Sequence, residues 1–151
     1  MKENAQNQES LKWQVGKTLL TAETFGQPAS EIVMDCRVCT QPGEGFRSLL
    51  VKALWDTGTS TTVISPRVAS RLGLKPKGSA KTNAVGSVRQ SGLTSAYLWL
   101  PNSMMIGPMM VVVDEIPSVD VLLGMDVIRF GKFTIERKPD GGTRFTFDIK
   151  T

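Results

Sequence analysis

Asp56 is the residue whose setting in the sequence best suits chemistry. In the segment Leu54–Ser65 an apolar approach is followed by Asp56, Thr57 and Gly58 and then by a run rich in β-branched residues. This pattern predicts two strands joined by a tight turn that carries Asp56. A carboxylate held in such a turn can serve as a general acid or base, whereas the simpler interpretation is a solvated aspartate in a β-turn.

The composition removes several other kinds of catalysis. The chain has no histidine, which excludes Ser-His-Asp and Cys-His arrangements and imidazole-based zinc sites. Cys36 and Cys39 form one Cys-x-x-Cys pair, and no second pair completes a zinc site. On a strand they would point to opposite faces, so we interpret them as ordinary buried or half-buried thiols, with a redox or metal role as the alternative. Catalysis must then rest on carboxylates, lysines or hydroxyls, and we expect no metal or organic cofactor.

The bulk properties predict one domain in a chain of 151 residues, of which 40% are hydrophobic. Residues 1–20 are expected to form a flexible polar tail, and residues 21–151 the folded domain. The net charge of +4 comes without a long basic run, so nucleic acid is not an expected partner. No segment is apolar for long enough to cross a bilayer, so we expect a cytoplasmic protein without a membrane segment, and a removed leader or anchor stays open as an alternative.

Strand-like segments dominate the chain. Glu31–Val38 and Phe46–Leu54 flank a turn and predict an antiparallel hairpin that leads to Asp56. Residues 140–142, Asp-Gly-Gly, predict the loop of a later hairpin. Further strands are expected over Leu93–Leu100, Met104–Val113, Phe133–Glu136 and Thr143–Ile149.

One short helix is predicted directly after the Asp56 region. Ser65 is a suitable N-cap, Pro66 suits the first helical position, and Gly73 suits a left-handed C-terminal residue. Val68 and Leu72 lie four residues apart and would share the buried face. We therefore expect a helix of about two turns.

Together these features resemble the retropepsin-like aspartic proteases over most of residues 46–149. The resemblance rests on the Asp56 turn, the capped helix and the later segment Leu122-Leu123-Gly124. It implies an all-β fold, a closed β-barrel with one or two short helices, whose single Asp-Thr-Gly lobe forms a homodimer. Retroviral members carry an ion pair at the positions held here by Ser60 and Met125, so the chain is more similar to cellular and bacterial single-domain relatives.

The resemblance also implies a function, because aspartic proteases need two carboxylates that share one proton. No other aspartate of this chain is followed by Ser/Thr-Gly, so the partner carboxylate would be Asp56 of a second copy. The pair would activate a water molecule for hydrolysis of a peptide or protein substrate. Thr57 would bond across the two-fold axis, and Gly58 would let backbone N–H groups approach the carboxylates.

Other site residues follow from the same resemblance. Thr59 and Ser60, together with a flap around Val85, Gly86 and Ser87, would bind substrate, although an ordinary surface hairpin is the alternative for the flap. Leu122, Leu123 and Gly124 would form a ψ-shaped loop under the active site. A catalytically silent dimerisation or peptide-binding module is the alternative function for the whole chain.

Three residues near these segments receive supporting roles. We expect Asp126 to cap the helix that follows it and Asp120 to be a buried carboxylate with a local partner. Trp55 is expected to pack near the dimer interface.

Overall fold

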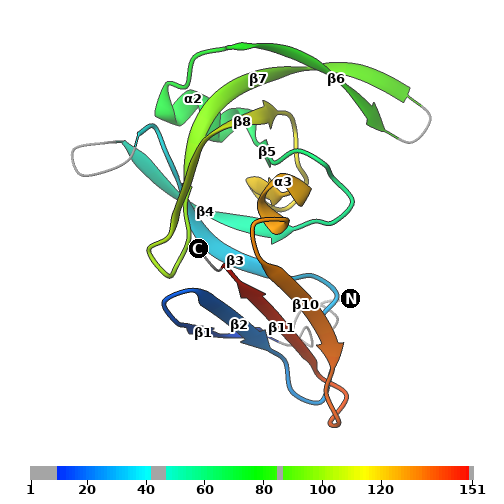
Figure 1. Cartoon of the computed structure of the whole chain (residues 1–151). Helices are drawn as coiled ribbons and strands as arrows, with labels where there is room; N and C mark the ends of the chain where they lie inside the picture. Colours follow the sequence, from blue (N-terminus) through cyan, green and yellow to red (C-terminus); the bar gives the residue numbers. More distant parts are fainter. Residues whose placement is uncertain (1–9, 42–46, 85–86, 150–151) are drawn as a thin grey trace.

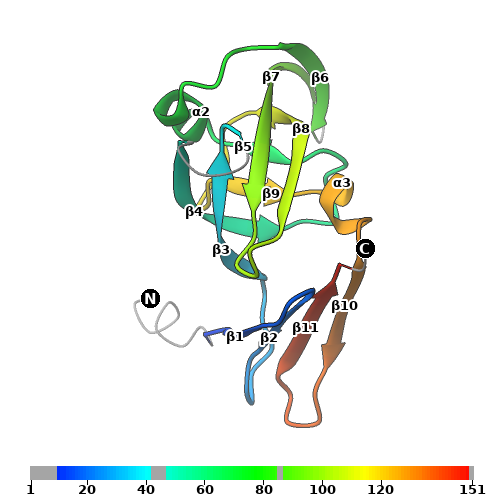
Figure 2. The same cartoon turned by 60° about the vertical axis from the view of Figure 1, so that its left-hand side comes forward.

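Six strands close into a barrel in the computed structural model, which describes residues 10–41, 47–84 and 87–149. Hydrogen bonding follows the order β3, β4, β9, β5, β8, β7, and β7 pairs with β3 to close the ring (Figure 1, Figure 2). Their bounds are β3 Val33–Cys39, β4 Ser48–Trp55, β9 Val121–Leu123, β5 Val63–Ile64, β8 Met105–Val113 and β7 Ser87–Trp99.

The barrel closes around side chains that alternate along its strands. In β3, Met34, Cys36 and Val38 are buried while the residues between them are exposed, and in β4 Val51 and Ala53 repeat the pattern. This period of two directs every second side chain to one face of a strand. The predicted hairpin between these strands is confirmed, because β4 pairs antiparallel with β3 along the whole of β3.

A long hairpin extends beyond the barrel. β6 (Gly78–Ala84) pairs antiparallel with the first half of β7, whose second half belongs to the barrel wall. The hairpin projects over the side of the molecule from which the loop between β4 and β5 also emerges (Figure 1). It is therefore the candidate flap, although its tip at residues 85–86 lies outside the described residues.

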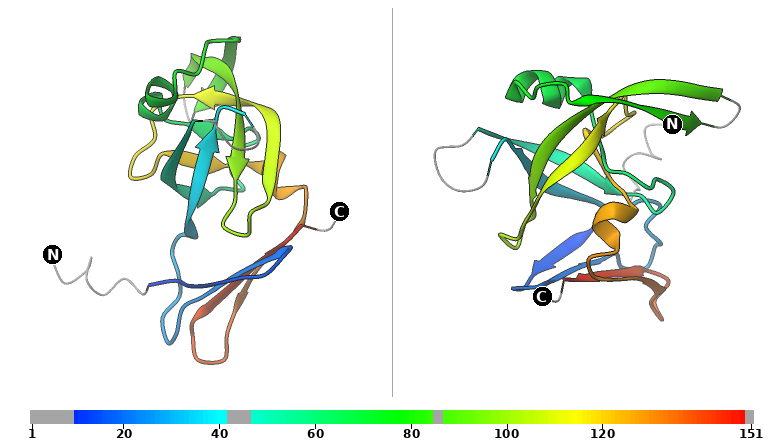
Figure 3. Two further views of the ribbon diagram at one scale, coloured as in Figure 1. Left: turned by 90° about the vertical axis from the view of Figure 1, so that its left-hand side faces the viewer. Right: turned by 45° about the horizontal axis from the view of Figure 1, so that its top comes forward.

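A second sheet of four strands lies at one end of the barrel (Figure 2, Figure 3). Its order is β1 (Lys12–Val15), β2 (Leu19–Glu23), β11 (Thr143–Asp148) and β10 (Lys132–Arg137), with every pair antiparallel. Leu20, Ala22, Phe145 and Phe147 are fully buried on its inner face. The expected hairpin around residues 140–142 is confirmed as β10 and β11.

Regular structure begins before residue 21, the expected boundary between the tail and the domain, because β1 and the first residues of β2 precede it. Strand β1 already begins at Lys12, and Leu20 has no exposed surface. The polar composition of the first residues led the prediction to extend the tail too far, because β1 is an edge strand with mostly exposed side chains that pairs through its backbone.

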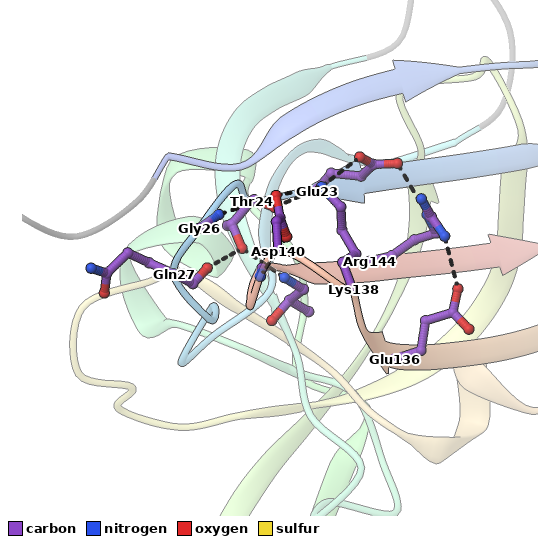
Figure 4. Close-up of polar contacts among 10 residues, drawn as sticks. Glu23, Thr24, Gly26, Gln27, Glu136, Lys138, Asp140 and Arg144 are labelled. Atoms are coloured by element: carbon purple, nitrogen blue, oxygen red, sulfur yellow. Dashed lines mark hydrogen bonds and ion pairs between the residues drawn. The ribbon is translucent and has the colours of Figure 1, made fainter.

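A charged cluster joins the strands at the far end of this sheet (Figure 4). The Lys138 ammonium, with the side chain only 8% exposed, lies 3.0 Å from the Glu23 carboxylate and donates a hydrogen bond to the Thr24 carbonyl at 3.0 Å. Arg144 bridges Glu23 and Glu136 at 3.1 and 3.2 Å. Residues from β2, β10 and β11 are thereby tied together across one end of the sheet.

Two short helices complete the described part of the chain. α2 (Pro66–Leu72) has Ser65 as N-cap, with its hydroxyl accepting from Val68 N–H, and ends at Gly73 in the left-handed region. The helix predicted from the sequence is thus confirmed together with its caps. α3 (Met125–Ile128) follows β9 directly.

The prediction of an all-β closed barrel with one or two short helices is therefore confirmed. Within the described residues, neither helix has the length and apolar character needed to traverse a lipid bilayer.

Candidate active site

Asp56 lies at the end of β4, at the start of a tight turn. Its backbone N–H donates to the Leu123 carbonyl at 2.9 Å, which fixes the turn on β9. Its carboxylate oxygen Oδ1 accepts a hydrogen bond of 2.8 Å from the Gly58 N–H. A β-carbon on Gly58 would lie 3.0 Å from this oxygen, so glycine allows the close approach of amide and carboxylate.

Strand β9 supports the turn from below because it lies between β4 and β5. It pairs parallel with β4, where Trp55 faces Leu123, and antiparallel with β5, where Val63 faces Leu122. The structure therefore places Leu122, Leu123 and the following Gly124 beneath the Asp56 turn, the position expected for the ψ-shaped loop.

The loop that follows the turn is fixed to the start of α3. Met125 N–H donates to the Thr59 carbonyl at 2.9 Å, and Asp126 N–H donates to the Ser60 carbonyl at 3.2 Å. A β-carbon on Gly124 would lie 2.9 Å from the Thr59 carbonyl oxygen, closer than side chains tolerate. The approach of the two segments thus requires a glycine at position 124.

Asp126 has a different role from the one predicted. Residue 124, a glycine, is the N-cap of α3, and the Asp126 carboxylate instead accepts hydrogen bonds from the Thr62 N–H at 2.9 Å and the Thr62 hydroxyl at 2.7 Å. Thr62 is fully buried, and its hydroxyl oxygen also accepts from the Gly124 N–H at 3.2 Å. The expectation of a helix cap was wrong because the carboxylate has a partner far away in the sequence.

Thr62 is the supporting residue that the sequence reasoning missed. The only signal for it was its place in the polar, β-branched run after the turn. The hydroxyl of this buried threonine both donates to a carboxylate and accepts from a backbone amide. Removing it would leave both partners without this hydrogen bond and so lower the stability of the fold. Thr62 connects the loop after the Asp56 turn, Gly124 and α3.

The predicted site residues fall into two groups. Asp56, Thr57, Gly58, Thr59 and Ser60 form one continuous turn; Asp56 and Thr59 are half-buried and the others are exposed. Beyond this turn, Val85 and Gly86 lie outside the described residues, and Ser87 begins β7 on the hairpin.

A cavity of about 270 Å³ lies beside Asp56. Glu31, Ile32 and Leu54 line it, and so does Ile135 of β10, whose side chain is 55% exposed. The site thus borders the four-stranded sheet as well as the barrel.

Trp55, whose place near a dimer interface stays a prediction, is enclosed within the chain. Its side chain is 6% exposed and packs on Phe147 and Phe145 at ring-centre distances of 4.6 and 5.4 Å. Trp55 connects β4 to the four-stranded sheet, because both phenylalanines belong to β11. Aromatic contacts of this kind hold the base of the turn in place.

Asp120 has the local partners expected of it. Arg67 approaches its carboxylate at 2.7 Å and the Ser65 hydroxyl donates to it at 2.8 Å. The hydrogen bond from Arg67 is the main reason why the pKa of Asp120 lies below its ordinary value. The residue ties α2 to the loop before β9.

The two cysteines are buried and form no disulfide. Burial raises the pKa of Cys36 to about 12, so its thiol stays protonated at neutral pH. This supports the interpretation of both as ordinary buried thiols.

The sequence comparisons identify the family. The sequence model of the family described as "Aspartyl protease" matches residues 46–127, which is more than half of the chain. The chain therefore belongs to this aspartyl protease family, and the matched segment includes the Asp56 turn, β9 and the start of α3. No curated protein matches the chain in sequence.

Solved structures of retropepsin-like proteases share the fold. EIAV protease complexed with the inhibitor HBY-793 aligns with a TM-score of 0.53 and 18% identity, over 66% of this chain and 86% of that chain. A retropepsin-like aspartic protease from Rickettsia conorii aligns with a TM-score of 0.52 and 16% identity, over 91% of this chain and 97% of that chain. The expected retropepsin-like fold is thereby confirmed.

Proposed function

We propose that this protein is an aspartic endopeptidase whose active site forms when two copies bring their Asp56 turns together. The observation that carries the proposal is the Asp56 carboxylate, anchored by the Gly58 amide in a turn that β9 and α3 support from behind. The match of the aspartyl protease family over this same segment supports it.

The proposed chemistry needs both carboxylates. Oδ1 of each Asp56 is engaged by Gly58, which leaves Oδ2 to face the partner carboxylate and a bound water. Two carboxylates at short range repel each other when both are ionised, so the pair keeps one shared proton. The ionised Asp56 takes a proton from the water as it attacks the scissile carbonyl, and the protonated one donates to the carbonyl oxygen.

The resulting tetrahedral gem-diol then collapses without a covalent enzyme intermediate. A proton passes to the leaving nitrogen, the C–N bond breaks, and the products are a carboxylic acid and an amine. Thr57 is proposed to bond across the two-fold axis, and Thr59 and Ser60 to contact the substrate, together with the flap around Val85, Gly86 and Ser87. Because the reaction requires a shared proton, we expect the best activity at mildly acidic pH.

Asp56→Asn is the direct test. This near-isosteric change removes the acid and base functions, and we expect kcat/KM on a peptide library to fall by at least about 100-fold. Cleavage is measured by mass spectrometry at several pH values, with the full chain at equal concentration.

Asp35→Asn is the matched control. Asp35 is an exposed aspartate on β3, paired with the exposed Lys52, and is not part of the catalytic turn. Its variant should keep the wild-type rate. A wild-type chain that dimerises but cleaves no peptide would instead favour the silent peptide-binding module.

A further inference from the structure

We propose that a basic surface formed by α2, the segment after it and β6 binds an acidic segment of the substrate, near the residues that are cleaved. The basic surface consists of the exposed side chains of Arg47, Arg71, Lys75, Lys77 and Lys81. The inference rests on the proposed function, because it names the class of protein or peptide substrate that the Asp56 site would take.

The first observation is the uneven distribution of charge along the sequence. Residues 57–113 contain six Lys or Arg residues and no Asp or Glu. The rest of the chain holds the other 12 cationic residues and all 14 acidic residues, so its charges nearly cancel. The net charge of +4 therefore comes from the segment that contains α2 and the candidate flap hairpin.

The second observation is that the fold gathers these cations on one surface. Arg71, Lys75 and Lys77 follow one another from the end of α2 to the start of β6. Lys81 lies farther along β6, and Arg47 reaches the end of α2 from the start of β4, where its Nη2 donates to the Arg71 carbonyl at 2.9 Å. Figure 1 and Figure 2 show α2 and β6 at the opposite end of the molecule from the four-stranded sheet.

Contacts with β7 fix the backbone of the basic surface. The Lys77 N–H donates to the Leu93 carbonyl at 2.7 Å. The Lys75 carbonyl accepts a hydrogen bond of 2.7 Å from the hydroxyl of Thr94, which is buried. The two lysines are therefore held at a constant spacing, although their side chains are exposed.

Within the part of the chain that the structure describes, no carboxylate neutralises the basic surface. Arg71 and the three lysines have no ion pair there, whereas Arg67 of the same helix is paired with Asp120. Asp114 and Glu115 follow β8, and β7 separates that strand from β6. Unpaired cations of one sign attract an anionic partner and repel a cationic one.

The chemistry of the basic surface favours an acidic polypeptide over nucleic acid or a membrane. No Phe, Tyr or Trp occurs between Trp55 and Tyr97, so the segment that carries four of the five cations has no ring for base stacking or for anchoring at a lipid interface. The basic surface also continues into the hairpin that is proposed to cover the substrate. A polypeptide bound under this hairpin can reach the cations directly.

The position of the basic surface sets the length of the acidic segment. Lys81 precedes Ala84, the last residue of β6, by three residues, which is about 10 Å at the rise of a strand. From Lys75 to Lys81 the chain spans six residues, or at most about 20 Å. An extended substrate therefore needs an acidic segment of about six residues to contact the whole surface.

Charge reversal tests the proposal. The double variant Lys75→Glu/Lys77→Glu alters the basic surface outside the hairpin of β6 and β7. Lys12→Glu/Lys17→Glu is the matched control, because it changes the net charge equally at exposed lysines of the four-stranded sheet. Circular dichroism checks that both variants are folded.

Binding is measured in the Asp56→Asn background, so that it does not depend on cleavage. The probe is a fluorescein-labelled peptide with a run of about six Glu residues, which stay ionised at mildly acidic pH because their pKa is about 4.3. Fluorescence anisotropy should show at least about 10-fold weaker binding by the Lys75/Lys77 variant than by the control variant. The difference should vanish at about 1 M salt, where the screening length falls to about 3 Å.

Cleavage shows whether this binding serves the substrate. Two peptides share the sequence that the wild-type chain cuts best in the library, and carry either a run of Glu or a run of Ser beside it. The wild-type chain should cleave the Glu peptide with at least about 10-fold higher kcat/KM. In the Lys75/Lys77 variant this ratio should fall to about one, with the rate on the Ser peptide unchanged.

The outcomes separate this inference from the proposed function. Loss of the Glu preference in the Lys75/Lys77 variant alone supports the inference. Equal binding by both double variants, or equal cleavage of the two peptides by the wild-type chain, overturns it and leaves the protease proposal intact. Tighter binding of a DNA duplex or of phosphatidylserine vesicles through the same lysines also overturns it. A chain that binds the Glu peptide through these lysines but cleaves no peptide overturns the protease proposal alone.

Discussion

At the scale of single residues, the candidate site depends on contacts made behind the Asp56 turn. Asp56 is oriented by Gly58, but the loop that carries both is held by the buried Thr62 and its half-buried partner Asp126. Gly124 lets the loop approach the start of α3. The position of the Asp56 carboxylate is therefore set by groups that would not touch the substrate.

The pair of Thr62 and Asp126 gives a prediction at this scale. Thr62→Val keeps the shape of the side chain but leaves the Gly124 N–H and one carboxylate oxygen of Asp126 without their partner. We expect a loss of about 1–3 kcal/mol in the free energy of unfolding, measured by urea denaturation. Activity should fall as well, because the turn loses its support.

A double-mutant cycle with Asp126→Asn provides the check. If the two residues act as a pair, the double variant should lose less stability than the two single losses together, with a coupling energy of about 0.5–3 kcal/mol. Strictly additive losses would show that the bond does not couple the loop to α3.

At the scale of elements, α2 shows how local caps and a long-range contact combine. Ser65 and Gly73 define its two ends within the sequence itself. The Ser65 hydroxyl both accepts from the Val68 N–H and donates to Asp120, which also binds Arg67. The helix is thereby attached to the segment that precedes β9, and β9 supports Asp56.

Replacement of Ser65 tests this connection. Ser65→Ala removes the cap and the bond to Asp120, and we expect the protein to lose about 1 kcal/mol of stability. Thermal unfolding followed by circular dichroism measures the change. Ser70→Ala, at an exposed position of the same helix, should have an effect close to zero.

At the scale of the whole molecule, the barrel and the four-stranded sheet act as one body. The interior of the sheet packs on Trp55, the residue before Asp56, through Phe133, Phe145 and Phe147. The charged cluster of Glu23, Lys138 and its neighbours closes the far end of the sheet (Figure 4). A change in that sheet can thus reach β4, the strand that leads to Asp56, through packed rings.

The charged cluster predicts a pH dependence of stability. Hydrogen bonds from Lys138 and then Arg144 hold the pKa of Glu23 below its ordinary value. The cluster therefore contributes stability above the ordinary carboxyl pKa, and this contribution is lost as the pH falls through the lowered pKa of the folded state. Glu23→Gln should lower the Tm by a few degrees at pH 7 and change it little at about pH 2.

Thermal unfolding of both proteins across this pH range measures the effect. A Tm difference that stays constant from pH 7 to strongly acidic conditions would show that the charge of Glu23 contributes nothing. Glu136→Gln, which removes the exposed partner of Arg144, should show a smaller difference with the same sign.

The sequence by itself determined the features that depend on close neighbours. The Asp56 turn, the hairpin of β10 and β11, and α2 with its caps each result from residue types within a few positions of one another. Period-two alternation, turn residues and caps act over that range, so these elements could be predicted before any contact was known. The retropepsin-like fold was implied by the resemblance of these motifs, in this order, to that family.

Only the tertiary structure decided what lies behind the turn. Asp126 bonds Thr62 across 64 positions of sequence, and Trp55 packs on rings that come from the last strands of the chain. Strand β1 forms because β2 and β11 give it a sheet to join, although its own side chains are mostly exposed. Such contacts depend on which strands the topology makes neighbours, and local periodicity carries no information about that choice.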